Sequence, residues 1–228
     1  PIGTILTSAA AGSEMSSSAV ITNENGWLKR GYANDLSRCR FAVCNPELTY
    51  TLPAYQTACG CVDIMMHTME RYFTNAKDTM LTDGIGEALI RTVMHNAKIL
   101  CADPENYDAR AQVMWAGSLS HNGLTGCGTE GGDWCCHQIE HELGGMFDVA
   151  HGAGLAAVWG SWARYVYMDN PHRFAQFAVN VFGINETPGA PEKTALKGIE
   201  AMEDFFRSIE MPVSIAEMGI TLTDEQIE

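Results

Sequence analysis

The sequence predicts a mainly α protein: a helical bundle over residues 46–228, preceded by a strand-bearing segment in residues 1–45. The strand-like runs IGTILTS and SAVITNE, with the small-residue loop AAAGSEMSSS between them, lie before residue 46. After that point apolar residues recur at helical spacing over long segments. Because 46% of the chain is apolar, the bundle can bury a core of its own.

The individual helices follow from this periodicity and from residues that start or stop helices. Pro53 suits the first turn of a helix. Asp133 offers an N-cap, and Gly144-Gly145 is expected to end the helix that follows it. The expected helices span residues 53–74, 78–101, 105–125, 133–143, 152–168, 171–181, 191–209 and 214–218, and a third short strand spans Arg40–Cys44.

Composition narrows the class of protein. A net charge of −14 argues against nucleic acid and anionic membrane surfaces as partners, because both require basic patches. No apolar run reaches the roughly 18 residues of a membrane span. The eight cysteines include no CxxC pair, which favours reduced thiols in a cytoplasmic protein over a disulfide scaffold or a zinc finger.

Both ends of the sequence are expected to be internal to a longer protein. The chain opens at Pro1 directly in a strand-like run. It ends one turn after the T-x-x-Q helix start formed by Thr223 and Gln226. The sequence is therefore expected to be a fragment.

Four residues carry the predicted chemistry. Asp63 and His67 stand four residues apart in GCVDIMMHTMERY, so one helix face presents both. His137 and His151 stand fourteen apart in HQIEHELGGMFDVAH. Three imidazoles and one carboxylate suit Fe(II) or Zn(II) and not Ca or Mg, which prefer oxygen ligands. Glu70 is expected either to orient His67 through its second ring nitrogen or to be an ordinary helix-surface glutamate.

Two segments resemble the iron-containing (group III) alcohol dehydrogenases, and more closely their NADPH-dependent butanol dehydrogenase and aldehyde reductase branch. They are GCVDIMMHTMERYFT and, about seventy residues later, DWCCHQIEHELGGMFDVAHG. Similar segments run along almost the whole chain: LTSAAAGSEMSSSAVIT, FAVCNPELTYTLPAYQTACG and ENYDARAQVMWAGSLSHNGLTG. The resemblance implies an all-α metal domain in residues 46–228, and in residues 1–45 a remnant of an α/β dinucleotide-binding domain.

The resemblance also implies roles for single residues. It assigns Asp63, His67, His137 and His151 as metal ligands, and it places His141 near the metal and the nicotinamide. His141 is expected to relay a proton or to support a ligand by a hydrogen bond, with neither role favoured. Thr7, Ser13 and Lys29 match cofactor contacts, whereas Ala11 departs from the threonine that many members carry. The family's GGGS phosphate loop is absent from this sequence, so the chain alone is expected to bind dinucleotide poorly.

The expected activity is hydride transfer between NADH or NADPH and a small aldehyde or primary alcohol, with Fe²⁺ or Zn²⁺ as Lewis acid, in a homo-oligomer. Trp134, Phe147 and Trp159 are candidates to line the substrate pocket. Two alternatives remain. One is a glycerol dehydrogenase-like or dehydroquinate synthase-like enzyme, which the three histidines disfavour. The other is a non-catalytic metal-binding bundle.

Overall fold

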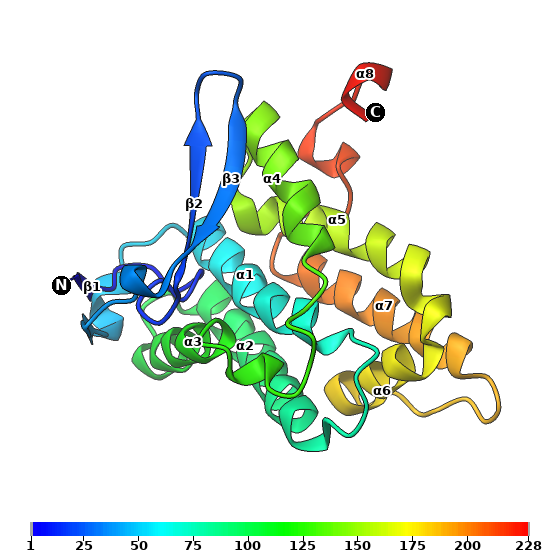
Figure 1. Cartoon of the computed structure of the whole chain (residues 1–228). Coiled ribbons are helices and arrows are strands. Elements are labelled where there is room, and N and C mark those ends of the chain that lie inside the picture. Colours follow the sequence, from blue (N-terminus) through cyan, green and yellow to red (C-terminus); the bar gives the residue numbers. More distant parts are fainter. Residues whose placement is uncertain (1, 228) are drawn as a thin grey trace.

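A computed structural model describes residues 2–227, and it consists mainly of helices (Figure 1). Helix α1 (Ala54–Tyr72) runs through the middle of the bundle, next to some of the other longer helices. These longer helices are α2 (Met80–Ala102), α3 (Tyr107–Ser120), α4 (Cys135–Phe147), α5 (His151–Val166), α6 (Pro171–Phe182) and α7 (Pro191–Ser208). The short α8 (Asp224–Ile227) follows near the C-terminus. No helix within the described residues is both long enough and apolar enough to cross a membrane.

Helix α1 forms the centre of the bundle. Every residue from Thr57 to Tyr72 is buried, because α2, α3 and α5 each pack against a different side of it. A helix that is apolar on all sides is stable only when it is covered in this way. The few polar side chains of α1 are therefore buried with it, and each needs a partner or a ligand.

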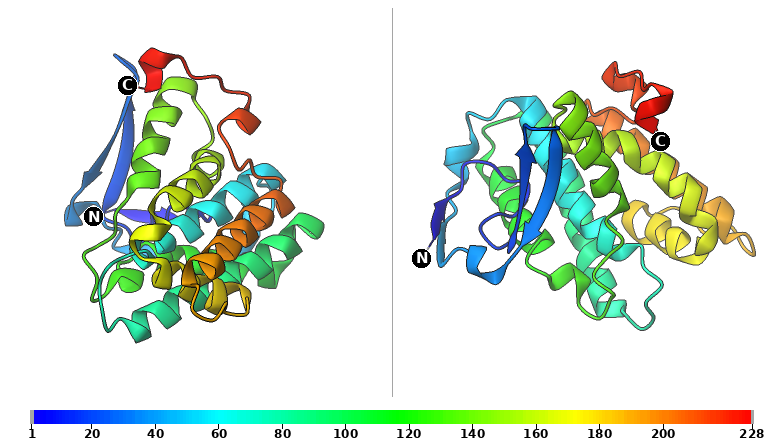
Figure 2. Two further views of the ribbon diagram at one scale, coloured as in Figure 1. Left: turned by 90° about the vertical axis from the view of Figure 1, so that its right-hand side faces the viewer. Right: turned by 45° about the horizontal axis from the view of Figure 1, so that its top comes forward.

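The N-terminal strands form two small sheets beside the bundle. Strand β1 (Gly3–Ile5) pairs in parallel with β4 (Phe41–Val43), and β2 (Ser18–Asn23) forms an antiparallel hairpin with β3 (Leu28–Ala33). The hairpin stands alongside α4 in two of the three views (Figures 1 and 2). Its close approach depends on Gly145 of α4, where a Cβ would lie 2.5 Å from the Trp27 carbonyl oxygen.

Several expected elements differ from those observed. Strand β3 was not predicted, because its LKRGYA sequence lacks a clear apolar alternation. The expected helix 105–125 ends at Ser120 and gives way to a 3-10 turn (Leu124–Gly126), and residues 216–218 also form only a 3-10 turn.

The start and the end of α4 also differ from expectation. Trp134, and not Asp133, is the N-cap residue, although the Asp133 carboxylate does accept a hydrogen bond from the Cys135 amide. Gly144-Gly145 does not end the helix, which continues to Phe147. These glycines admit the hairpin to the helix surface instead of stopping the helix.

Candidate metal centre

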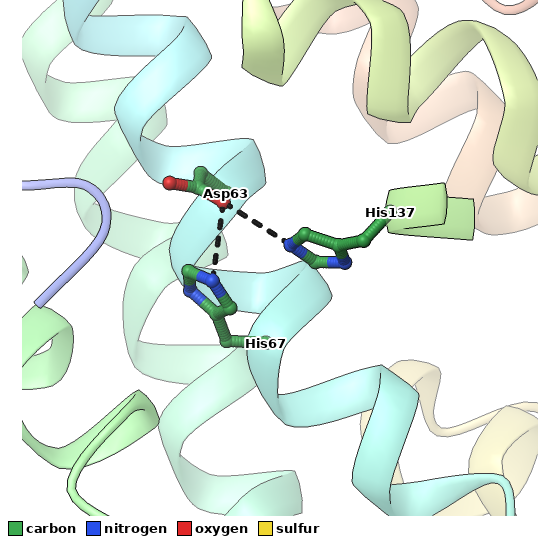
Figure 3. Close-up of side chains that lie close together, drawn as sticks. All are labelled: Asp63, His67 and His137. Atoms are coloured by element: carbon green, nitrogen blue, oxygen red, sulfur yellow. Dashed lines mark ion pairs between the residues drawn. The ribbon is translucent and has the colours of Figure 1, made fainter. Parts of the chain in front are cut away.

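Three helices bring the four predicted residues together, with the three histidines around Asp63. Helix α1 supplies Asp63 and His67, α4 supplies His137, and α5 begins at His151. The Nε2 atoms of His67 and His137 each lie 3.6 Å from Asp63 Oδ1 (Figure 3), and that of His151 lies 3.5 Å from it. Asp63, His67 and His137 are buried, whereas the side chain of His151 is 31% exposed. The cluster is therefore closed on the inner side and open beside α5.

These spacings fit a metal ion. Donor atoms in a tetrahedral site with bonds of about 2.0–2.2 Å are separated by about 3.3–3.6 Å. Asp63 Oδ1 and His137 Nε2 are buried and accept or donate no hydrogen bond in the structure. Buried polar atoms without partners are rare and costly, so atoms aimed at one shared point indicate a ligand between them. The nitrogen-rich donor set suits Fe(II) and Zn(II) alike.

The electrostatics of the cluster also favour a cation. Burial alone would raise the pKa of Asp63, but the nearby histidines outweigh it and hold that pKa well below its usual range. Burial would lower the pKa of His137, yet the neighbouring carboxylates of Asp63 and Glu70 raise it to about 9. For His67, burial dominates and the pKa falls well below its usual value. The carboxylates thus attract positive charge while His67 remains a neutral donor.

Glu70 orients a different histidine from the one expected. Its Oε1 accepts a hydrogen bond from His137 Nδ1 at 2.9 Å and another from the His137 backbone N–H at 3.0 Å. The prediction that Glu70 orients His67 was wrong, and so was the surface alternative, because Glu70 is 2% exposed. His67 Nδ1 has no hydrogen-bond partner in the structure. Its ring is held instead by stacking on His121 at 4.0 Å and His137 at 4.8 Å between centroids.

An aromatic wall next to His67 was not anticipated. Arg71 Nη2 donates to His121 Nδ1 at 3.1 Å, which leaves the other ring nitrogen, Nε2, to donate to Ser18 Oγ at 2.9 Å. Burial, reinforced by the charge of Arg71, lowers the pKa of His121 to about 4. The same guanidinium lies over the Trp134 ring at 4.6 Å. Arg71 lies in the first motif and His121 lies fifty residues further along the chain, so sequence spacing gave no signal that the two would meet.

A cavity of about 830 Å³ opens in front of the cluster. Ser13, Lys29 and His141 line it together with the four clustered residues, whereas Thr7 is exposed and is not among its lining residues. The His141 ring stacks on His151 with centroids 5.7 Å apart. Burial, followed by the charge of His151, lowers the pKa of His141 to about 4.

Of the three aromatic residues expected to line the substrate pocket, one lines the cavity and two lie in or against the helical core. Trp134 lines the cavity, and its ring centroid lies 5.1 Å from that of His137. Trp159 is fully buried in the helical core, and Phe147 packs against that core, so neither lines the cavity. Large aromatic residues serve both cores and pockets, so sequence alone could not separate these two roles.

Lys29 and Glu140 form an ion pair at the open side of the cluster. Lys29 Nζ lies 3.0 Å and 3.2 Å from the two carboxylate oxygens of Glu140. Glu140 also accepts a hydrogen bond from His151 Nδ1. The spacing of Glu140 three residues after His137 repeats that of Glu70 after His67, and this repetition was a signal that could have identified Glu140.

Comparison with known proteins identifies the family of this chain. The sequence model of the Fe-containing alcohol dehydrogenase family, C-terminal, matches residues 57–228. The chain is 40% identical over 221 residues to NADH-dependent butanol dehydrogenase A of Clostridium acetobutylicum, covering 96% of this chain and 56% of that protein. It is 34% identical over 220 residues to the NADPH-dependent aldehyde reductase YqhD of Escherichia coli, with 96% and 56% covered.

Solved structures give the same result. The crystal structure of NADH-dependent butanol dehydrogenase A from Thermotoga maritima superposes with a TM-score of 0.93 at 39% identity, covering 97% of this chain and 55% of that one. The chain thus spans about half the length of the relatives it matches. With its mainly helical fold and the matched residues, this chain belongs to the iron-containing alcohol dehydrogenase family, to whose C-terminal part it corresponds.

Proposed function

We propose that this chain is the metal-binding part of an NAD(P)H-dependent alcohol dehydrogenase or aldehyde reductase that acts on small primary alcohols and aldehydes. Asp63, His67, His137 and His151 are the metal ligands in this proposal. The observation that carries it is the convergence of three imidazole Nε2 atoms within 3.5–3.6 Å of one buried Asp63 oxygen. The names of the matched relatives, butanol dehydrogenases and an aldehyde reductase, support the reaction and the substrate class.

The residues around the cluster have different roles in the proposed reaction. When bound, Fe(II) or Zn(II) supplies Lewis acidity that polarises an alcohol or carbonyl oxygen. Glu70 holds the His137 ring in the orientation that directs Nε2 inward. His141 borders the cavity, and its imidazole is neutral at pH 7, so one ring nitrogen can accept a hydrogen bond from an alcohol and pass its proton on.

The size and lining of the cavity support the proposal that a nicotinamide ring binds beside the cluster. The residues that line it include Ser13, Ser16, Ser17 and Ser18, whose small side chains leave room for a planar ring. Hydride transfer between the nicotinamide and the substrate carbon is the chemistry of the cofactor, so the protein's task is to hold both next to each other. Relatives of both NADH and NADPH dependence match this chain, and the proposal covers both dinucleotides.

Two measurements test the proposal. Metal analysis of anaerobically purified protein should find one Fe(II) or Zn(II) per chain. The full-length gene product that contains this chain should then oxidise NADH or NADPH with butanal. A metal-free protein after reconstitution would refute the ligand set. Stoichiometric metal without turnover of any aldehyde would leave a non-catalytic metal-binding bundle and refute the enzymatic part.

A further inference from the structure

The metal cluster is built from a repeated four-residue unit. His67 and Glu70 on α1 form one H-x-x-E unit, and His137 and Glu140 on α4 form a second. In each unit the glutamate hydrogen-bonds the histidine of the next helix: Glu70 holds His137, and Glu140 holds His151. The two glutamates thus link the three helices in the order α1, α4, α5.

Glu140 occupies a site shaped around its carboxylate. It is fully buried, and Lys29 of strand β3 balances its charge. Two glycines make the space: a Cβ on Gly144 would lie 3.0 Å from Glu140 Oε1 and 2.6 Å from Lys29 Nζ, and one on Gly154 would lie 2.7 Å from Glu140 Cγ. Separations below 3.0 Å are too close for a real Cβ, so a side chain at Gly144 would displace the Lys29 ammonium and one at Gly154 would displace the Glu140 side chain.

His151 depends on this support more than the other histidines do. It is the first residue of α5, it follows a loop in which Asp148 has a φ of +52°, and its side chain is 31% exposed. His137, by contrast, lies within α4, is buried and is held by Glu70 at both its ring and its backbone. Within the described residues, Glu140 is the one hydrogen-bond partner of the His151 ring.

We infer that Glu140 is a positioning residue for the metal centre: by accepting from His151 Nδ1 it directs His151 Nε2 toward Asp63, and Lys29 compensates its charge. The inference rests on the metal site proposed above. A carboxylate that fixes the ring and the tautomer of a metal-binding histidine typically raises metal affinity about 10–100-fold. Lys29 thereby has a role in the ion pair, separate from the cofactor contact expected for it.

A second metal site formed by Glu140, His141 and His151 is the competing interpretation, because their donor atoms lie within 4.8 Å of one another. The observed contacts disfavour it. The Glu140 carboxylate is already engaged by Lys29 and by His151 Nδ1, while His151 Nε2 faces Asp63. A second ion would have to displace Lys29 from its partner.

The test compares Zn(II) affinity, measured by chelator competition, in the purified chain and in two variants. Glu140→Gln keeps the shape of the side chain but removes its charge and faces Lys29 with an amide. Its affinity should fall about 10–100-fold. Glu142→Gln is the matched control, because Glu142 lies on the same helix and pairs with Arg30 on the same strand, 2.8 Å apart but exposed. Its affinity should change less than about twofold.

A rescue variant separates positioning from simple misfolding. Adding Lys29→Met to Glu140→Gln removes the unpaired ammonium, so part of the lost affinity should return. The visible spectrum of the Co(II)-substituted protein should also differ between the wild type and Glu140→Gln, because the His151 ring changes its orientation.

Unchanged Zn(II) affinity in a folded Glu140→Gln would overturn the inference. A fall from two ions to one, with the affinity of the remaining ion intact, would establish the second metal site instead. A wild type that binds no metal would reject the metal site itself.

Discussion

Two buried polar clusters lie in the same helical bundle, and they differ in how their hydrogen bonds are satisfied. Around Asp83 of α2, both carboxylate oxygens accept from Arg173, at 2.5 and 2.6 Å, and further hydrogen bonds come from Thr79 and Gln176. Around Asp63 of α1, Oδ1 accepts none, although three imidazoles surround it. The first cluster is complete as a structural link between α2 and α6. The second is complete only with a further ligand.

This difference separates structural from functional burial of charge. Both aspartates are less than a tenth exposed, so burial alone does not distinguish them. An ion pair with good geometry and saturated hydrogen bonds ties elements together. Buried polar atoms that have no hydrogen-bond partner and lie close together indicate a ligand-binding site. The following predictions test whether the two clusters behave in these different ways.

The largest effect is expected for Asp63→Asn. Among the described residues, Asp63 provides the one carboxylate oxygen that lies near all three Nε2 atoms, so its neutralisation should reduce metal affinity by more than about 100-fold. The stability of the metal-free protein should also fall, because the charge interactions that hold the pKa of Asp63 below its usual range are lost, although no hydrogen bond to Oδ1 is lost with them. Chelator competition and thermal melts measure the two quantities. A large loss of metal-free stability with metal affinity retained would place Asp63 with the structural cluster.

Replacing His151 and His141 separates the two histidines on the open side. His151→Ala should lower metal affinity strongly, because three ligands hold a metal far less tightly than four. His141→Ala should retain the metal but slow aldehyde reduction in the full-length gene product by about 10²–10⁴-fold, the usual contribution of a proton-transferring group. If both variants lose metal equally, His141 is a ligand and the assigned set is wrong.

Asp83→Asn should differ from Asp63→Asn in its effect on the metal. It leaves Arg173 buried without a charge partner, which should cost about 3–5 kcal/mol of stability at pH 7, while metal affinity stays unchanged. Burial raises the pKa of Asp83, but hydrogen bonds from Arg173 outweigh it and hold that pKa below its usual value.

The contribution of Asp83 to the free energy of unfolding should depend on pH in one direction. A carboxyl group whose pKa is lowered by folding stabilises the protein above its unfolded pKa, and this contribution is lost as the pH falls through the folded value. The loss of unfolding free energy caused by Asp83→Asn should therefore become smaller below about pH 4. Denaturant melts of the two proteins from pH 7 down to pH 3 measure it, and a constant difference over that range would contradict the assigned ion pair.

The smallest effects concern two glycines in helices. A Cβ on Gly152 would overlap the Cys59 carbonyl oxygen, so Gly152→Ala should separate α5 from α1 at the start of α5 and cost about 1–3 kcal/mol. Gly84 is exposed on α2 with open space around it, so Gly84→Ala should stabilise by about 0.5–1 kcal/mol. Thermal melts compare the pair. Equal effects of the two substitutions would show that helix propensity, and not close helix packing, dominates at Gly152.

Local spacing predicted the helices of the bundle and the shared face of Asp63 and His67, because both depend on the 3.6-residue repeat. The grouping of His137 and His151 with them came from the types of donor and from the resemblance to a known family. The contacts of Glu70, Glu140 and His121 depend on which helices are neighbours, and nothing in the sequence nearby specifies that. The helix through Gly144-Gly145 shows the same limit: glycine usually ends a helix, yet here it makes room for a hairpin more than a hundred residues away. The roles of Thr7, Ser13 and Lys29 toward a cofactor remain predictions.

The order in which the three helices are linked has a consequence for how the protein folds. Asp63 and His151 are 88 residues apart in the sequence, so closing that loop costs about 4 kcal/mol of chain entropy in the simplest model. An ion held by both residues binds the folded chain and not the unfolded one, and it therefore stabilises the folded state by mass action. A molecule in which α5 is misdocked cannot retain the ion. The metal content of a preparation should thus report the fraction of correctly folded molecules.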